Sequence, residues 1–197
     1  MKDVYAYRVY DNLYINLTNR CCNACAFCIR DEGDGIENSG SLWLSGEPTA
    51  VAAIAAIKEF DPKEYADVVF CGYGEPTYAL TVMLEVAAYA RSIGKKTRLN
   101  TNGLGCFING KDIVPLLKGA IDCVSVSLNE SDPDRYDALC KPRFAGAYDE
   151  ILRFTAACVK AGIDTTMTIV NDGDIDIDKC ARVCESTGAK FRVREKI

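Results

Sequence analysis

The feature of this sequence that most limits its fold is a regular alternation of short strand-like segments with longer helix-like ones. The strand-like segments are residues 13–17, 67–71, 97–100, 123–128, 165–170 and 191–194. The helix-like segments are residues 48–60, 77–93, 111–117, 133–139, 147–161 and 178–186. Such alternation predicts a parallel sheet covered by helices. We therefore expect one α/β domain over residues 1–197, either a curved half barrel or an open doubly wound sheet.

Composition and charge disfavour several functional classes. Hydrophobic residues make up 49% and charged residues 26% of the chain, as in ordinary soluble proteins. No apolar run approaches the roughly 20 residues that cross a bilayer, and the first residues lack the pattern of a secretory signal. We therefore expect a cytoplasmic protein without membrane association. The net charge of −5 argues against a nucleic-acid partner.

The strand-like segments alternate apolar and polar residues. In the fourth segment Val124, Val126 and Leu128 alternate with Ser125, Ser127 and Asn129. In the third segment Leu99 lies between Arg98 and Asn100. In the sixth segment Phe191 and Val193 alternate with Arg192 and Arg194. Successive side chains of a strand point to opposite faces, so we expect the apolar sets under the helices. The polar inner face that results is typical of a ligand-filled surface, because buried polar groups need partners. The alternative is a face exposed to water.

Four of the eleven cysteines fall within residues 21–28, in the stretch NRCCNACAFCIR. A disulfide knot, a zinc site and an iron–sulfur cluster are the three structures that could use them. The odd number of cysteines, and the position of several in strand-like segments, disfavours a disulfide scaffold. A structural zinc site needs four ligands, and the chain has no C-x2-C pair outside this stretch and no His. Three thiolates from one loop suit a [4Fe–4S] cluster that has one open iron.

The spacing of Cys21, Cys25 and Cys28, which is C-x3-C-x2-C directly after the first strand, resembles the signature of the radical S-adenosylmethionine (SAM) superfamily. The resemblance implies a partial (β/α)6 TIM barrel, in which these cysteines hold a [4Fe–4S] cluster and SAM chelates the open iron. It also implies that Phe27, just before the last cysteine, packs near the adenine of SAM. Cys22 is not expected to be a ligand.

The second motif is FCGYGEPTY, residues 70–78, at the end of the second strand-like segment. It resembles the family's glycine–glycine–glutamate element, which contacts the SAM amino group, and the matching residues are Gly72, Tyr73, Gly74 and Glu75. Tyr73 stands where the family often has glycine. A glycine-rich turn lets the backbone approach a ligand closely, and a carboxylate can hold an ammonium group. The alternative is an ordinary turn before a helix that begins with proline.

Polar residues at later strand ends extend the expected cofactor site. Asn100 ends the third strand-like segment, and Ser127 and Asn129 resemble the S-x-N pair that the family often places on the ribose hydroxyls. The SAM carboxylate needs a cation, which Arg192 or Arg194 could supply as a bidentate fork, and we assign it to Arg194. Surface arginines on an edge strand are the alternative.

The stretch 127–152, with the segments LYINLTNRC and FCIR, resembles a small group of radical SAM proteins named for their association with the TatD family of metal-dependent hydrolases. The resemblance implies reductive cleavage of SAM to a 5′-deoxyadenosyl radical, which abstracts hydrogen from a small molecule or a protein loop. It implies an electron donor such as flavodoxin or ferredoxin, and a TatD-family hydrolase as a partner. The alternative is a non-catalytic iron–sulfur protein that transfers electrons or senses redox state, and the G-x-G-E and S-x-N elements count against it.

Two expectations concern the remaining polar and sulfur groups. Arg98, Asn100, Arg192 and Arg194 on the inner face predict a substrate that carries a negative group. The cysteines outside the motif are expected to be buried thiols rather than ligands of an auxiliary cluster.

Overall fold

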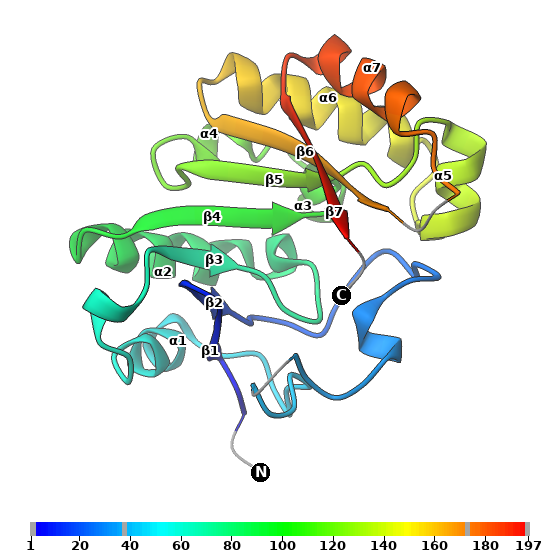
Figure 1. The fold of residues 1–197 in the computed structure, drawn as a ribbon. Helices are drawn as coiled ribbons and strands as arrows, with labels where there is room; N and C mark the ends of the chain where they lie inside the picture. The colour runs from blue at the N-terminus through cyan, green and yellow to red at the C-terminus, as the bar shows by residue number, and fades with distance from the viewer. Residues whose placement is uncertain (1–2, 37–38, 172–173, 196–197) are drawn as a thin grey trace.

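The computed structural model describes residues 3–36, 39–171 and 174–195. These residues form one curved sheet, and helices run along its outer face (Figure 1). The seven strands are β1 (Ala6–Val9), β2 (Asn12–Ile15), β3 (Asp67–Phe70), β4 (Lys96–Thr101), β5 (Cys123–Ser127), β6 (Asp164–Asn171) and β7 (Lys190–Glu195). They lie in the sheet in chain order, and every neighbouring pair is parallel except β1–β2. The expected α/β fold and partial barrel are confirmed.

The helices occupy the connections between the parallel strands. The α-helices are α1 (Ala50–Ile57), α2 (Leu80–Ser92), α3 (Gly105–Asn109), α4 (Val114–Leu117), α5 (Pro133–Cys140), α6 (Ala147–Lys160) and α7 (Ile177–Thr187), and short 3-10 segments are η1 (Ile29–Asp31), η2 (Pro62–Glu64) and η3 (Pro76–Ala79). Several helices begin after a residue whose side-chain oxygen accepts a hydrogen bond from a backbone N–H. At the start of α1, for example, the Thr49 side chain accepts from Ala52 N. Glycine in the left-handed conformation ends α7 at Gly188.

The outer face of the sheet carries the core. Val124, Val126 and Leu128 are buried in one cluster with Leu99 and the inward faces of α2 and α6, as their alternation predicted. Burying each such side chain contributes about 1.5–3 kcal/mol to folding. The expectation that the apolar residues of each strand lie under the helices fails at one residue of β7. Phe191 packs against the core, but Val193 is 36% exposed because β7 is an edge strand that the described helices only partly cover.

Two elements were absent from the prediction. Strand β1 pairs antiparallel with β2 through a tight turn at Tyr10, whose φ is +51°. Such turns ordinarily contain Asn or Gly, so the sequence lacked the usual signal. Helix α3, which is only five residues long, was not expected. The helix expected at 111–117 is present as the shorter α4.

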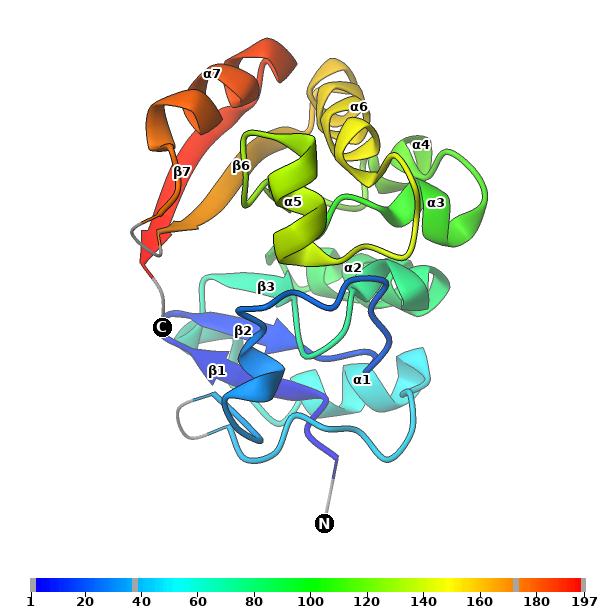
Figure 2. The same cartoon turned by 90° about the vertical axis from the view of Figure 1, so that its right-hand side faces the viewer.

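The sheet brings the loops that follow its strands to one end. The cysteine loop after β2, the glycine-rich turn after β3 and helix α5 after β5 all lie at the carboxyl ends of the parallel strands (Figures 1 and 2). Ligands of barrel and open α/β folds bind at this end.

Candidate functional site

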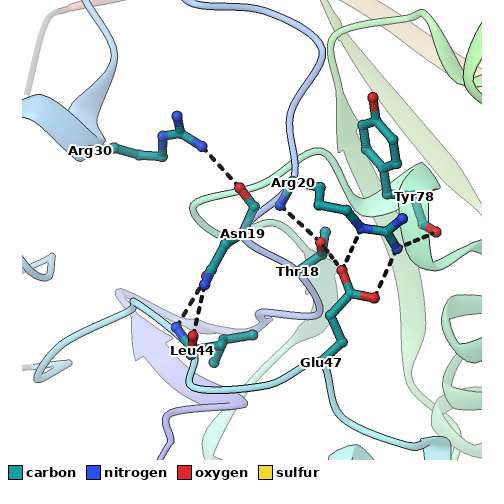
Figure 3. A network of polar contacts seen from close by, with 7 residues as sticks. All are labelled: Thr18, Asn19, Arg20, Arg30, Leu44, Glu47 and Tyr78. Carbon is teal, nitrogen blue, oxygen red and sulfur yellow. Dashed lines mark hydrogen bonds and ion pairs between the residues drawn. The ribbon is translucent and has the colours of Figure 1, made fainter.

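The start of the cysteine loop is held by a polar network (Figure 3). The Arg20 guanidinium donates to both Glu47 carboxylate oxygens, at 2.7 and 2.8 Å, and to Tyr78 O at 3.2 Å. Thr18 Oγ1 donates to the same Glu47 carboxylate, and the Arg20 guanidinium lies 4.9 Å from the centroid of the Tyr78 ring. Asn19 pairs through its amide with both backbone polar groups of Leu44. The loop therefore leaves β2 in a fixed direction.

The far side of the cysteine loop is attached to the end of α5. Ala24 N donates to Cys140 O at 3.1 Å, Ala26 N donates to Leu139 O at 2.9 Å, and Arg143 N donates to Cys22 O at 2.9 Å. These backbone bonds join segments more than a hundred residues apart in sequence. They place the predicted ligand loop beside the helix that follows β5.

The three predicted ligands, Cys21, Cys25 and Cys28, are partly exposed in this loop. In the part of the chain that the structure describes, no three Cys, Asp or Glu side chains converge on a single point. Instead, a hydrogen bond with Cys22 lowers the pKa of Cys21 to about 7. A hydrogen bond with Cys140, together with burial, raises the pKa of Cys25. Burial raises the pKa of Cys28.

These residues fit an iron–sulfur cluster by the chemistry of their donors. All three are soft thiol donors from eight consecutive positions, and Cys21 and Cys25 lie close enough to Cys28 to add to the rise in its pKa. The chain has no His that would favour zinc. Asn102, which the sequence reasoning missed, donates to Cys22 Sγ at 3.2 Å and lies 3.9 Å from Cys21 Sγ. Its only sequence signal is its position directly after β4.

The glycine-rich turn packs tightly against the start of the cysteine loop. A Cβ on Gly74 would lie 2.3 Å from Thr18 O and 2.6 Å from Arg20 O. Glu75 N donates to Arg20 O at 2.8 Å. Gly72 is similarly close to the Asn16 side chain, with 2.2 Å between an added Cβ and Oδ1. Glycine is therefore required at position 74 because the backbone of one loop touches the other, whereas at position 72 it leaves room for the Asn16 side chain.

Glu75 is buried and accepts four hydrogen bonds. Thr77 N, Thr77 Oγ1 and Thr101 Oγ1 donate to Oε1, and Asn102 N donates to Oε2 at 2.7 Å. Burial raises the pKa of Glu75, and these hydrogen bonds oppose the rise. None of the described Lys or Arg residues forms an ion pair with it. A buried carboxylate without a counter-ion is suited to an ammonium group of a ligand.

A cavity of about 170 Å³ lies between this turn and the inner face of the sheet. Five of the predicted cofactor residues line it: Gly74, Glu75, Asn100, Ser127 and Arg194. Asn100 Oδ1 and Arg194 Nε are buried and have no hydrogen-bond partner among the described residues. Burial lowers the pKa of Arg194, which is the direction expected for a cation removed from water. The cavity thus carries a buried carboxylate without a counter-ion and a half-buried guanidinium whose Nε has no partner among the described residues.

The remaining predicted residues lie elsewhere. Tyr73 points away from the cavity into a second small core cluster, where its hydroxyl donates to Gly33 O at 2.6 Å. Phe27 packs against the main core, and Gly72 does not line the cavity. Asn129, at φ +61°, donates through Nδ2 to Cys140 Sγ at 3.6 Å, so its side chain serves the cysteine loop and α5.

Two other cavities bear on this assignment. A second one of about 170 Å³ continues along the inner face and shares Ser125 and Arg192 with the first. A larger one of about 560 Å³ lies on the outer side, between Phe107 of α3 and Phe144. None of the unpaired buried polar atoms of the described residues belongs to a residue that lines this larger cavity. We therefore place the functional site on the inner face, where Asn100 Oδ1 and Arg194 Nε lack partners among the described residues.

The chain is similar to a known family and to named relatives. A family model described as "Radical SAM superfamily" matches residues 15–184. GTP 3′,8-cyclase of Corynebacterium glutamicum (strain R) is 30% identical over 207 residues, covering 96% of this chain and 50% of that protein. GTP 3′,8-cyclase of Mycobacterium ulcerans is 28% identical over 192 residues, covering 94% and 50%. The chain therefore spans half the length of these curated relatives.

Solved structures share the fold. SuiB of Streptococcus suis bound to S-adenosylmethionine has a TM-score of 0.64 at 17% identity, over 93% of this chain and 38% of that chain. Methylornithine synthase has a TM-score of 0.64 at 18% identity, over 96% and 54%. No helix of the described residues is long and apolar enough to span a membrane. From the family match over residues 15–184, this chain belongs to the radical SAM superfamily, whose enzymes use a [4Fe–4S] cluster and SAM.

Proposed function

We propose that this chain binds SAM in the inner-face cavity, beside a [4Fe–4S] cluster held by Cys21, Cys25 and Cys28. The observation that carries the proposal is that one cavity is lined both by Glu75, which is buried without a counter-ion, and by Arg194, whose buried Nε has no partner among the described residues. The amino-acid end of SAM carries the complementary pair, an ammonium and a carboxylate. Each protein charge is stabilised by such a partner, because a buried ion without one is unfavourable.

The side chains then have separate tasks. Glu75 Oε2, which accepts one internal hydrogen bond, has capacity left for the ammonium group, and the Arg194 guanidinium can hold the carboxylate through two N–H groups. Asn100 and Ser127 line the same cavity and supply further polar groups. The bound cofactors supply the one-electron chemistry, reductive cleavage of SAM to methionine and a 5′-deoxyadenosyl radical. We further propose flavodoxin or ferredoxin as the electron donor and, on sequence resemblance, a TatD-family hydrolase as a partner.

Binding of SAM to the cluster-loaded protein tests the cofactor site. Arg194→Gln should weaken SAM binding by about 1.5–3 kcal/mol, the range for a hydrogen bond to a charged group. Arg194→Lys should fall between the wild type and the Gln variant, because Lys keeps the charge and loses the fork. Arg182→Gln removes the same charge from an exposed position of α7 and is the matched control. Equal affinity in the Arg194 and Arg182 variants would exclude this site.

We propose that the substrate carries an anionic group bound by Arg192. Arg98 was expected to share this task, but its guanidinium donates to Asp67 Oδ2 at 2.6 Å and is neutralised. Arg192 forms no ion pair among the described residues and lines both inner-face cavities. The relatives are named GTP 3′,8-cyclase, and GTP is a polyanionic nucleotide, which supports an anionic substrate for this chain.

The substrate class is tested by the rate of SAM cleavage with panels of anionic compounds, GTP included, and neutral ones. Stimulation should be confined to anions, and Arg192→Gln should reduce it while Arg182→Gln leaves it unchanged. Stimulation by neutral compounds alone, unaffected by Arg192→Gln, would contradict the assignment.

A further inference from the structure

We propose that Cys140 is a resolving cysteine for Cys25, so that peroxide oxidation of this cluster ligand ends in a reversible Cys25–Cys140 disulfide. The proposal rests on the assignment of Cys25 as a cluster ligand, and on the contact between these two thiols across two distant segments. Nothing in the radical SAM signature requires a cysteine at the end of α5.

The geometry holds the two residues side by side. Ala24 N donates to Cys140 O and Ala26 N donates to Leu139 O, so backbone bonds flank Cys25 on both sides. The Cys25 thiol hydrogen-bonds the Cys140 thiol. Cys140 is completely buried, and Asn129 Nδ2 lies 3.6 Å from its sulfur. Cys25 is partly exposed. Peroxide reaches the more accessible of the two thiols first, and a cysteine held beside it can then resolve the sulfenic acid.

The other cysteine pair of the loop is less suited to this role. Cys21 and Cys22 are adjacent in sequence, so their Cα atoms are about 3.8 Å apart. Most disulfides span roughly 4.4–6.8 Å between Cα atoms, and shorter separations are strained. Cys25 and Cys140 belong to different segments and have no such restriction. They are therefore the better pair for a disulfide.

The chemistry balances with peroxide as the oxidant. The Cys25 thiolate attacks one oxygen of hydrogen peroxide, breaks the O–O bond and gives a sulfenic acid and hydroxide. The Cys140 thiolate then attacks the Cys25 sulfur, and the sulfenic oxygen leaves as water once protonated. The two thiols are oxidised by two electrons in total, and the peroxide is reduced. Without Cys140, a second peroxide converts the sulfenic acid to a sulfinic acid, which thiol reductants do not reverse.

Peptide mapping of the full chain in its cluster-free form tests the disulfide directly. After hydrogen peroxide treatment and alkylation of free thiols, trypsin should release residues 21–30 cross-linked to residues 136–143, because Arg20, Arg30, Arg135 and Arg143 bound these peptides. Fragmentation should assign the cross-link to Cys25. Cross-links confined to residues 21–30 would overturn the proposal.

Recovery of cluster binding tests the consequence. Peroxide-treated protein is reduced with dithiothreitol and supplied with iron and sulfide, and the bound cluster is compared with that of untreated protein. The wild type and Cys158→Ala, which removes another buried thiol, should recover. Cys140→Ala and Cys140→Ser should not, and sulfinic acid should be found at Cys25. Recovery equal to the wild type in both Cys140 variants would overturn the proposal.

These experiments separate this proposal from the cofactor assignment. Peptide mapping needs no cluster, and the untreated protein shows by itself whether the three cysteines bind one. The Ser variant keeps a polar group in place of the thiol, so it shows whether the effect of the Ala variant comes from loss of the thiol or from a folding defect. A circular dichroism melt of each variant confirms that the comparison is made between folded proteins.

Discussion

At the scale of single residues, the site depends on side chains that serve two purposes. Glu75 joins the turn after β3 to the end of β4 through hydrogen bonds from Thr77, Thr101 and Asn102, and it also faces the cavity. Removing it therefore leaves several buried donors without an acceptor, at about 1–3 kcal/mol each. Loss of SAM binding in a Glu75 variant would combine both effects, which is why Arg194 is the better test of cofactor binding.

Gly74 gives a sharper prediction at this scale. In Gly74→Ala the new methyl group would meet the carbonyl oxygens of Thr18 and Arg20, which are backbone atoms and cannot rotate away. We expect a loss of about 1–3 kcal/mol in the free energy of unfolding, as in overpacked interiors, and less cluster bound. Gly46→Ala is the control, because nothing lies within 4 Å of its added Cβ. Chemical denaturation of both variants makes the comparison, and equal stability would contradict the contact.

At the scale of elements, the loops at the carboxyl ends of the strands support one another. The segment after the cysteine loop is fixed by Tyr73, whose ring packs edge-on against Trp43 at 5.2 Å and whose hydroxyl binds Gly33 O. Arg30 adds hydrogen bonds to Asn19 O and Tyr73 O. Tyr73 therefore replaces a family glycine with a side chain that anchors a neighbouring segment.

Tyr73→Phe removes only the hydroxyl from this anchor. The variant should lose about 1 kcal/mol in the free energy of unfolding, as for one hydrogen bond. Amide hydrogen exchange should become faster around Gly33 and Trp43. Tyr10→Phe removes a hydroxyl from a residue that is 73% exposed, and it should change neither quantity. Unchanged exchange in the Tyr73 variant would mean that its hydroxyl does not hold the segment.

The opposite end of the sheet gives a pH-dependent prediction. Burial alone would raise the pKa of Asp122, but hydrogen bonds from Thr97 and Arg91 outweigh it and lower the pKa below its ordinary value of 3.8. A carboxyl with a lowered pKa stabilises the fold above its unfolded pKa and loses that contribution as the pH falls through the folded value. Asp122→Asn should therefore be less stable than the wild type at pH 7, by an amount that shrinks below about pH 3.8.

Thermal melts across this pH range measure the effect. Asp137→Asn is the control, because Asp137 is exposed and its side chain makes no hydrogen bond or ion pair among the described residues. Its melting temperature should follow that of the wild type at every pH. A difference between Asp122→Asn and the wild type that persisted unchanged to low pH would refute the link to ionisation.

At the scale of the whole molecule, the parts of the fold set by repeating patterns could be predicted from the sequence. The apolar alternation of Val124, Val126 and Leu128 identified both the strand and its buried face. Asn129 does not continue that alternation, because its backbone is left-handed and its side chain contacts Cys140; its role in cofactor binding stays a prediction. The contact of Cys140 with Cys25 depends on tertiary docking of α5, which no local pattern encodes.

The central claim is that this chain uses a three-cysteine cluster to cleave SAM. Anaerobically reconstituted and reduced protein should be incubated with SAM and assayed for 5′-deoxyadenosine by chromatography, beside a variant in which Cys21, Cys25 and Cys28 are replaced by Ala. The account predicts 5′-deoxyadenosine with the wild type and none above background with the variant. Cluster-loaded wild type that binds SAM yet forms no 5′-deoxyadenosine, or formation that persists in the variant, would contradict it.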